Sequence, residues 1–199
     1  MPLRNAAATL RMAVDGILAQ SFGDFEFILF DHGSTDATPE MIRQYAETDP
    51  RIKTASCHGS FIDAINMSWQ MANGDLIARM DSDDFAYPDR IAKQREFLII
   101  HPELVGCASR VRILKKNTAT GIISLPDSGY ATYDKWINSI ISARQIARER
   151  FIDNPLPNPS TMMRREILEE MGGYRNAIWA EDYDLLTSPA PSRLFSGEN

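Results

Sequence analysis

Apolar residues recur along the chain with two different spacings, and each spacing predicts one kind of element. The inner face of a helix repeats every three or four residues, whereas a buried strand is a short continuous apolar run. Leu10, Val14 and Ile17 have the helical spacing, and residues 25–30 form a run of strand length. The same two patterns predict helices over 6–20, 38–47, 61–72, 88–100, 133–150 and 165–171, and strands over 25–30, 51–56, 76–80, 104–114 and 160–163.

The alternation of these elements predicts an α/β fold. Helices of about a dozen residues between short apolar strands are typical of a mostly parallel sheet that helices cover on both faces. Thr38 is expected to cap the second helix, with Pro39 in its first turn. Gly172 and Gly173 are expected to end the last helix. Residues 117–129, which contain Gly and Pro, are expected to form a loop or a hairpin.

The composition limits the partners and the compartment. The 199 residues suffice for one full-sized core, and a net charge of -6 with dispersed basic residues offers no positive field, so no nucleic-acid partner is expected. Cys57 and Cys107 form no CxxC pattern, which favours a reducing compartment. No apolar run reaches about 18 residues, which predicts no membrane span, and Asp15 disfavours a signal peptide. We therefore expect a soluble, cytoplasmic domain.

Acidic residues gather in three places, 31–36, 81–84 and 181–184. The first two groups follow predicted strands, and ligands of a parallel sheet collect beyond the carboxyl ends of its strands. Neighbouring carboxylates repel one another unless a cation or hydrogen-bond donors compensate, and Mg²⁺ needs only one or two carboxylates beside substrate phosphates. Asp81 and Asp83 therefore indicate half of a metal site that a diphosphate completes. A carboxylate of the third group could remove a proton from an incoming hydroxyl.

Several segments of the chain, taken in sequence order, resemble those of the family 2 inverting glycosyltransferases. Residues 25–36 are similar to a strand followed by the family's Asp-Asp-Gly-Ser-Thr-Asp turn, and residues 74–84 are similar to the segment that carries its DxD motif. Residues 158–165 and the later Gly-Gly-Tyr and Glu-Asp-Tyr-Asp motifs resemble the acceptor half. The resemblance runs from Asn5 to Leu185. It implies a GT-A type fold, with a mostly parallel central sheet flanked by helices.

The resemblance also implies a division of the chain. A single domain would span 1–185, with a nucleotide-sugar-binding half over 1–116, an acceptor half over 117–185 and an irregular tail over 186–199. The family's first strand is largely missing before Asn5, and two prolines in the tail break the helix that relatives have there, so truncation at both ends is implied. A shortened strand exposes sheet edges, which leaves a homo-oligomer open.

The resemblance implies a reaction and the residues that perform it. A sugar would pass with inversion from a nucleotide-diphosphate donor to a hydroxyl of a glycan, lipid-linked or small-molecule acceptor. Asp182 would be the general base with Glu181 beside it, and Asp83 would hold Mn²⁺ or Mg²⁺, which stabilises charge on the leaving diphosphate. The implied substrate-binding residues are Pro2, Leu3, Arg4, Asp31, His32, Asp81 and Ser82. The product would be cell-envelope polysaccharide, and a lipid-linked acceptor would hold the chain peripherally at the inner face of the membrane.

Some residues near the motifs keep more than one interpretation. Asp36 is interpreted as a turn or cap residue and Asp84 as a structural carboxylate, whereas Arg79 could approach a phosphate or pair with a neighbouring acid. His32 stands where relatives have a second Asp that contacts the nucleotide base. A neutral imidazole accepts a hydrogen bond but supplies no carboxylate, so uridine, thymidine and guanosine donors stay open.

Other functions also stay open. The missing first strand and the unusual tail are compatible with an inactive remnant that binds a nucleotide or a partner chain without turnover. A nucleotidyltransferase also combines an α/β sheet with metal-binding aspartates, but it needs a glycine-rich basic phosphate loop that residues 2–6 do not supply. Turns and helix starts favour acidic residues for local reasons, so such a role stays open for each acidic group alone.

Overall fold

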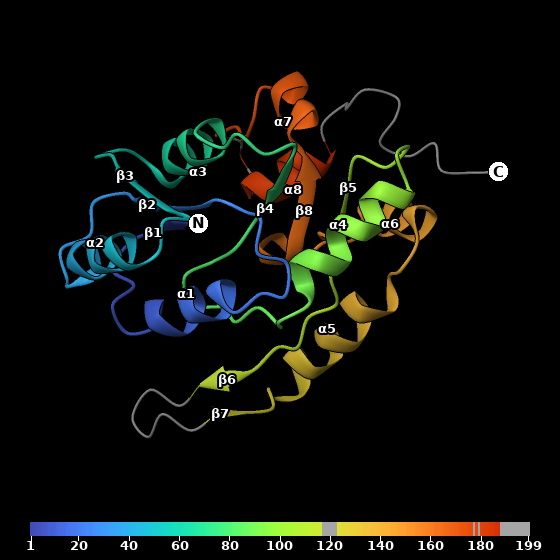
Figure 1. The fold of residues 1–199 in the computed structure, drawn as a ribbon. Coiled ribbons are helices and arrows are strands. Elements are labelled where there is room, and N and C mark those ends of the chain that lie inside the picture. Colours follow the sequence, from blue (N-terminus) through green and yellow to red (C-terminus); the bar gives the residue numbers. More distant parts are fainter. Residues whose placement is uncertain (117–122, 177, 179, 188–199) are drawn as a thin grey trace.

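The amino-terminal part of the chain forms a parallel three-stranded sheet (Figure 1). The computed structural model describes residues 1–116, 123–176, 178 and 180–187. The strands β1 (Pro2–Leu3), β2 (Phe27–Asp31) and β3 (Ile52–Ser56) lie in the order β1-β2-β3, and every residue of β2 is buried. Pro2 pairs with Phe30, and Phe27 pairs with Ile52. The predicted parallel sheet is confirmed, and its first strand has only two residues.

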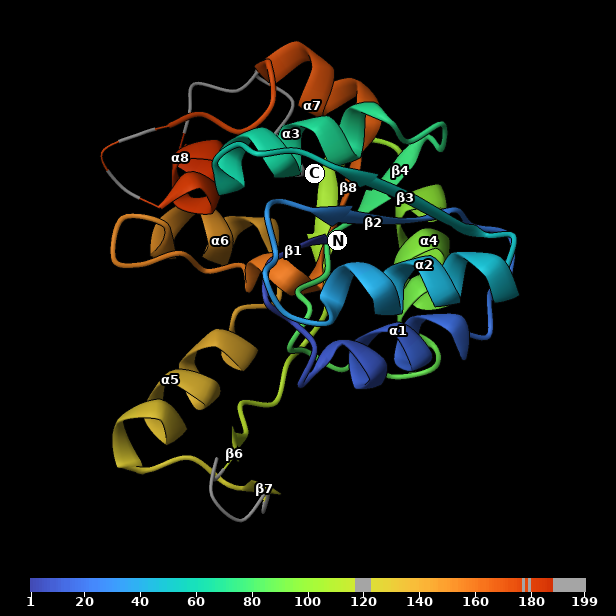
Figure 2. The same ribbon diagram turned by 90° about the vertical axis from the view of Figure 1, so that its left-hand side faces the viewer.

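Helices cover both faces of this sheet (Figure 2). The helices α1 (Leu10–Leu18) and α2 (Thr38–Thr48) lie on one face, and α3 (Phe61–Gln70) lies on the other. Leu10 and Val14 of α1 are fully buried and belong to the same core cluster as Leu29 of β2. Burial of each such side chain contributes about 1.5–3 kcal/mol. This burial explains why the apolar spacing predicts a helix here, although the helix is shorter than the predicted 6–20.

A second sheet joins strands from distant parts of the sequence. The strand β8 (Thr161–Arg164) lies between β4 (Leu76–Ala78) and β5 (Gly106–Ala108) and is antiparallel to both. The helix α4 (Arg90–Ile100) packs against this sheet, and α7 (Arg165–Met171) follows β8 directly. Gly106 fits the close approach of β8, because a Cβ atom there would lie 2.7 Å from the Met162 carbonyl oxygen. The strand itself was predicted over 160–163, but its antiparallel position between β4 and β5 was not.

The remaining elements include a hairpin and a helix that lie to one side of the two three-stranded sheets (Figure 1). The strands β6 (Lys115–Lys116) and β7 (Ile123–Ser124) form the predicted hairpin, whose residues 117–122 lie outside the described part. They are followed by α5 (Ser128–Ser139), α6 (Ala143–Glu149), the 3₁₀ turn η1 (Asn158–Ser160) and α8 (Glu181–Thr187). Helix α8 includes two residues that we expected in the irregular tail, and the rest of that tail, 188–199, is not described. Within the described ranges, every helix is too short or too polar to span a bilayer.

Two observed elements differ from those predicted from the sequence, because side chains form hydrogen bonds with the backbone there. The strand expected over 104–114 is reduced to β5, since the N–H groups of Val111 and Ile113 donate to side chains of α5, at 2.9 Å each. The helix expected over 133–150 is divided into α5 and α6. The division occurs at Ser142, whose side chain forms a new capping box with Gln145.

The expected cap of α2 is also wrong. Thr38 is fully buried, and its Oγ1 accepts a hydrogen bond from the Ala6 N–H at 2.8 Å instead of capping its own helix. The carboxylate of Asp36 accepts from the Thr38 N–H at 3.0 Å and from the Ala7 N–H at 3.1 Å. The local role proposed for Asp36 is therefore confirmed, and both contacts tie the start of α1 to the start of α2.

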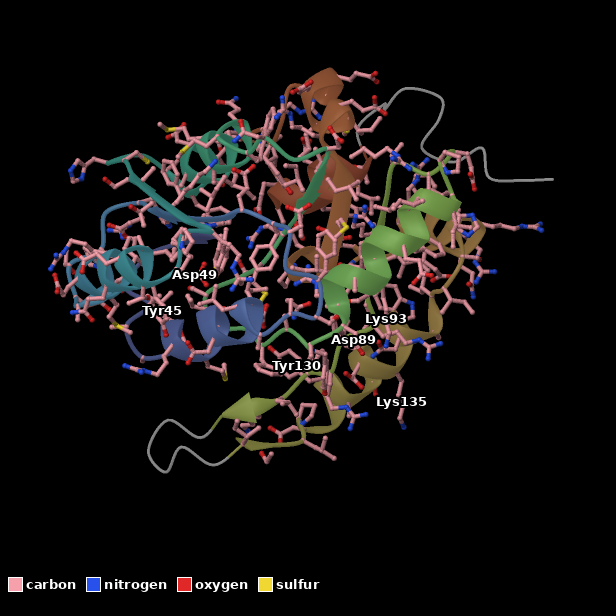
Figure 3. All side chains as sticks on the ribbon, viewed as in Figure 1. Tyr45, Asp49, Asp89, Lys93, Tyr130 and Lys135 are labelled. Carbon is pink, nitrogen blue, oxygen red and sulfur yellow. The ribbon has the colours of Figure 1, made fainter. Side chains whose placement is uncertain are left out.

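The outer faces of the helices are polar (Figure 3). Asp89 and Lys93 form an exposed ion pair beside the start of α4, with 3.5 Å between the charged atoms. Arg43 of α2 pairs with Glu40 and Glu47, again on an exposed face. Exposed pairs of this kind contribute at most about 1 kcal/mol. The apolar faces beneath them therefore hold these helices in place.

Both cysteines are free thiols, and Cys107 provides a test of the second sheet. Burial raises the pKa of Cys107 to about 11, and its Sγ lies 3.9 Å from the Gln94 carbonyl oxygen. The thiolate is the reactive form. In a Cys57→Ser variant at pH 8, we expect the folded chain to react with an aromatic disulfide reagent about 10²-fold more slowly than the urea-unfolded chain. A Cys107→Ser variant, which keeps Cys57, is the matched control, and equal rates for folded and unfolded Cys107 would contradict the burial of β5.

Candidate active site

The first acidic group is held in a turn that joins two loops. The N–H of Ser34 donates to both oxygens of Asp31, at 3.2 and 3.3 Å, and the Ser34 hydroxyl also donates to Asp31. Asn5 has a φ of 51°, a left-handed conformation that Asn adopts more readily than most residues. Its N–H donates to Ser34 Oγ, and its Oδ1 accepts from the Thr35 N–H, each at 2.8 Å. The loop after β1 and the loop after β2 therefore form one rigid surface.

His32 lies in this turn with an unused hydrogen-bonding atom. Its Nδ1 is buried and has no partner among the described residues, and its ring meets the ring of Phe61 edge to face at a centroid distance of 6.0 Å. Burial and the nearby Arg4 charge hold the pKa of His32 below its ordinary value. A buried polar atom without a partner costs about 1–3 kcal/mol. A ligand that bonds to this nitrogen would recover that cost.

The three residues expected to bind substrate at the amino terminus differ in what they expose. Pro2 and Leu3 are buried in β1, and the Leu3 side chain is part of the core. The Leu3 carbonyl accepts from the His32 N–H at 3.1 Å. Arg4 is exposed. Of the three, only Arg4 presents its side chain to solvent beside His32.

The second acidic group begins beside a buried arginine. The Nη1 of Arg79 lies 2.5 Å from a carboxylate oxygen of Asp81 and donates to the Met80 carbonyl at 2.6 Å. The guanidinium carbon lies 5.6 Å from the centroid of the Phe61 ring. The Nε of Arg79 is buried without a partner among the described residues. Of the two roles left open for Arg79, the structure contains the salt bridge to a neighbouring acid.

The residues that follow Asp81 differ in their exposure to solvent. Ser82 is half-buried, Asp83 is exposed, and Asp84 is half-buried below them. Burial, together with the charges of Asp81 and Asp83, raises the pKa of Asp84 to about 6. The described residues contain no group of three or more His, Cys, Asp or Glu side chains that could enclose a metal ion. Asp81 and Asp83 nevertheless fit a hard divalent ion that takes its remaining ligands from water and phosphate oxygens.

The third acidic group opens α8. The Nδ2 of Asn154 donates to the carboxylate of Asp182 at 2.8 Å, and the Tyr183 N–H donates to its other oxygen at 2.7 Å. The Nδ2 of Asn158 lies 3.5 Å from the carboxylate of Glu181. A cavity of about 440 Å³, lined mainly by apolar side chains, opens beside Asp182 and Asn154. Asn154 orients the carboxylate of Asp182, and both residues line this cavity.

Two aromatic residues lie near the acidic groups. Phe61 contacts both His32 of the first group and Arg79, the partner of Asp81 in the second. Tyr174 is buried near the second and third groups, and burial raises its pKa to about 12, with the charges of Glu181, Asp182 and Asp81 acting in the same direction. For this part of the chain the sequence predicted only a helix over 61–72, which begins at Phe61. The place of Phe61 between two motifs had no separate signal, because a core aromatic has the same pattern.

Asn66 fixes Tyr174 and was also missed. Its Oδ1 accepts from the Tyr174 N–H at 2.8 Å and from Trp69 Nε1 at 3.0 Å, and its Nδ2 donates to the Tyr174 carbonyl at 2.8 Å. The available signal was a polar residue between Ile65 and Trp69 on the apolar face of α3.

We expect Asn66→Ala to lower the free energy of unfolding by about 2–3 kcal/mol, because it leaves partly buried backbone groups of Tyr174 unpaired. Urea denaturation followed by circular dichroism measures this loss. Met67→Ala, at an exposed position on the same helix, is the control and should change stability by less than about 0.5 kcal/mol. Equal losses for the two variants would show that the hydrogen bonds between Asn66 and Tyr174 add nothing to the stability of the fold.

Comparison with known proteins identifies similar sequences over most of the chain. The family described as Glycosyl transferase family 2 matches residues 1–172. An uncharacterized glycosyltransferase of Haemophilus influenzae is 29% identical over 183 residues, which is 90% of this chain and 55% of that protein. The O-antigen biosynthesis glycosyltransferase WbnJ of Escherichia coli is 28% identical over 177 residues, 87% of this chain and 63% of that protein. The chain therefore spans less than two thirds of the length of these relatives.

Solved structures with the same fold have lower sequence identity. The mannosyltransferase PcManGT from Pyrobaculum calidifontis, in complex with GDP-Man and Mn²⁺, has a TM-score of 0.65 and 19% identity, over 92% of this chain and 48% of that one. Residues 1–349 of S. aureus TarS, in complex with UDP-GlcNAc, have a TM-score of 0.66 and 17% identity, over 93% of this chain and 50% of that one. Both are GT-A folds, and the likeness shows that this chain has the same fold.

Proposed function

Because the chain belongs to glycosyl transferase family 2, we propose that it transfers a sugar from a nucleoside-diphosphate donor to a hydroxyl of an acceptor, with inversion at the anomeric carbon. The observation that supports this most directly is that Phe61 contacts both His32 of the first acidic group and Arg79, the salt-bridge partner of Asp81 in the second. A transfer needs a donor, a way to stabilise the leaving group and a base within one space. Each acidic group would supply one of these.

The donor nucleotide would lie on the surface made by the first group. The unpaired Nδ1 of His32 would bond to the base, Arg4 would approach a phosphate, and Asp31 would keep the turn in place. The backbone of Pro2 and Leu3 would border this nucleotide-binding surface. Asp81 and Ser82 would contact the ribose and diphosphate. The neighbour proteins were solved with GDP-Man and with UDP-GlcNAc, so the base is left open between guanosine and a pyrimidine.

Asp83 would hold Mn²⁺ or Mg²⁺ together with the donor diphosphate. Its exposure leaves its oxygens accessible, and the excess of negative charge around it favours a cation. When bound, the ion stabilises negative charge on the departing diphosphate. Mn²⁺ accompanies GDP-Man in the mannosyltransferase structure. Arg79 would keep Asp81 oriented toward the same ligand through its salt bridge.

Asp182 would remove the proton from the acceptor hydroxyl. The hydrogen bond from Asn154 orients its carboxylate, and Glu181 lies beside it under the influence of Asn158. The apolar cavity next to Asp182 would receive the acceptor, either a glycan, a lipid-linked saccharide or a small molecule. We favour a cell-envelope saccharide, since one relative is an O-antigen biosynthesis enzyme. A lipid-linked form of it would place the chain at the cytoplasmic face of the membrane.

The test is binding followed by turnover. UDP, GDP and TDP, each with Mn²⁺, are added separately, and the melting temperature is measured. One of them is expected to raise it, because a ligand that binds only the native state stabilises that state. The matching nucleotide sugars are then assayed for hydrolysis and for transfer to saccharide acceptors. No shift with any nucleotide would contradict the proposal, and a shift without hydrolysis or transfer would assign the chain a binding role instead.

A further inference from the structure

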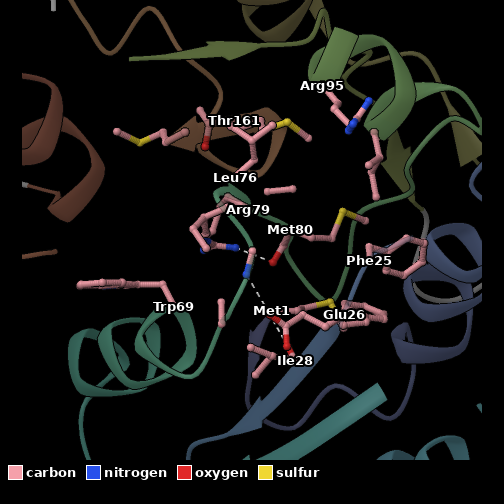
Figure 4. A pocket seen from close by; sticks show the side chains of 18 of the residues that line it. Met1, Phe25, Glu26, Ile28, Trp69, Leu76, Arg79, Met80, Arg95 and Thr161 are labelled. Atoms are coloured by element: carbon pink, nitrogen blue, oxygen red, sulfur yellow. Dashed lines mark hydrogen bonds between the residues drawn. The ribbon is translucent and has the colours of Figure 1, made fainter. Parts of the chain in front are cut away.

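Residues 81–84, which we call the acidic turn, are held in place by an arginine from another element. Arg90 is the first residue of α4. Its Nη2 donates to the Arg79 carbonyl at 2.6 Å and to the Thr161 carbonyl at 3.3 Å, and its Nη1 lies 3.3 Å from the sulfur of Met80. These groups lie where β4 has ended and the acidic turn begins (Figure 4). Arg90 therefore ties the start of the turn to the neighbouring strand β8.

Arg79 reinforces the same junction from within the chain. Its N–H donates to the Thr161 carbonyl at 2.9 Å, and its Nη1 donates to the Met80 carbonyl at 2.6 Å, which Figure 4 marks with a dashed line. Burial lowers the pKa of Arg90 to about 10, against the opposing charge of Asp84, so Arg90 stays charged at neutral pH. Hydrogen bonds from a charged donor are stronger than neutral ones. The junction is therefore held by two charged side chains.

Gln94 continues the contact from Arg90 to η1. Gln94 is buried one turn further along α4. Its Oε1 accepts from the Arg90 Nε at 3.0 Å, and its Nε2 donates to the Ser160 carbonyl at 2.7 Å. Ser160 is the last residue of η1, and Asn158, the first, has its Nδ2 3.5 Å from the carboxylate of Glu181. A continuous path of hydrogen bonds thus leads from the acidic turn to η1.

Both side chains in this path end in planar groups that form hydrogen bonds in fixed directions. A guanidinium presents its donors as a rigid fork, whereas a lysine amine is a point charge on a flexible stem. An amide accepts at its oxygen and donates at its nitrogen. The position of the acidic turn relative to η1 therefore depends on two rigid groups. A displacement of about 1 Å between reacting groups can cost about 10²-fold in rate.

We propose that Arg90 and Gln94 are positioning residues for the sugar transfer, an inference that rests on the proposed function. Arg90 holds the acidic turn so that Asp83 is oriented toward the metal ion. Gln94 keeps η1, and with it the carboxylates that open α8, at a set position relative to that turn. Both act through other residues and neither needs to touch a substrate.

The first test measures affinity for Mn²⁺ instead of activity. The nucleotide that stabilises the wild-type chain is kept saturating, and Mn²⁺ is titrated by calorimetry well below the melting temperature of every variant. Arg90→Lys keeps the charge but cannot bond both carbonyls in the same directions, and it should weaken Mn²⁺ binding about tenfold. Arg95→Lys is the matched control on the same helix, because the Arg95 guanidinium carbon lies 4.9 Å from the centroid of the Phe22 ring. It should change Mn²⁺ affinity by less than about twofold.

The second test separates Gln94 from Arg90. Gln94→Met removes both hydrogen bonds of the amide at nearly the same side-chain length. Because the acidic turn still has Arg90, affinity for Mn²⁺ should stay within about threefold, whereas kcat for transfer should fall at least about tenfold. In the wild-type chain, nucleotide with Mn²⁺ should slow hydrogen exchange of the Ser160 amide at least about threefold. That amide donates to the Pro157 carbonyl at 2.8 Å within η1, and Gln94→Met should abolish the slowing.

The outcomes separate this proposal from the proposed function. A wild-type chain that binds no nucleotide with Mn²⁺ would contradict the proposed function and, with it, both positioning roles. A wild-type chain that binds both, with equal Mn²⁺ affinities for Arg90→Lys and Arg95→Lys, would overturn only the role of Arg90. An unchanged kcat in Gln94→Met would overturn the role of Gln94. If Arg90→Lys does not fold, exchange of the Ser160 amide in the wild-type chain decides, because an unchanged rate would overturn the coupling.

Discussion

Asp182→Asn is expected to lower the rate of sugar transfer by about 10²–10⁴-fold while leaving the affinity for the donor nucleotide unchanged. Asparagine has nearly the same shape as aspartate and can still bond to Asn154, so the loop before η1 should keep its position. What it lacks is a carboxylate to take the acceptor proton. With saturating donor, the loss should therefore appear in kcat for transfer. The rise in melting temperature that the nucleotide produces should change less.

The matched control is Asp184→Asn, two residues further along α8. Asp184 pairs with Arg175, with 2.9 Å between the carboxylate oxygen and Nε. Its replacement removes one negative charge from the same helix and should change transfer by less than about threefold. If Asp182→Asn retains a tenth or more of the wild-type rate, another group removes the proton. If both variants lose activity equally, the cause is the altered charge of α8.

Asp83→Ala is expected to abolish the Mn²⁺-dependent part of the stabilisation by nucleotide. At a nucleotide concentration of 100 times Kd, the wild-type chain should gain about 2.7 kcal/mol, and a chain that cannot hold the ion should lose the share that requires Mn²⁺. Asp83 is exposed, so the substitution itself should alter the stability of the free chain by less than about 0.5 kcal/mol. The melting temperature is measured with nucleotide in the presence of Mn²⁺ and again with a chelator.

Asp89→Ala serves as the control for this measurement. Asp89 is an exposed carboxylate a few residues further on, where it pairs with Lys93. Its loss changes the net charge of the chain by the same amount and should leave the Mn²⁺-dependent shift intact. Identical shifts for wild type and Asp83→Ala would place the ion elsewhere.

The sequence predicted α1 to α4, α7 and the parallel strands β2 and β3, because their apolar residues repeat with the period of the element that buries them. It did not predict that β8 inserts antiparallel between β4 and β5, since periodicity states which residues are buried and not which strand pairs with which. The expected strand over 104–114 was too long for a related reason. Asn138 and Asp134, more than twenty residues away, take the hydrogen bonds of its second half.

The candidate site was predictable where its chemistry is polar. Asp31, Asp83 and Asp182 were assigned because three acidic groups follow one another in the order of the family resemblance, and their roles stay predictions. Phe61 has the pattern of an ordinary core residue and gave no separate signal, whereas Tyr174 belongs to the Gly-Gly-Tyr motif but its buried position could not be predicted from that motif. Asn66 shows the same limit, because its two backbone bonds are to a residue that is distant in sequence.

The position of β8 has a consequence for synthesis of the chain. The amino-terminal sheet is complete once residue 56 has left the ribosome, whereas β4 and β5 acquire a common partner only when residues 161–164 arrive. At roughly 5–20 residues per second, this interval lasts several seconds. During that time the apolar edge of β4 is available to other nascent strands. A translational pause before residue 161 should therefore increase aggregation, and a pause after residue 171 should not.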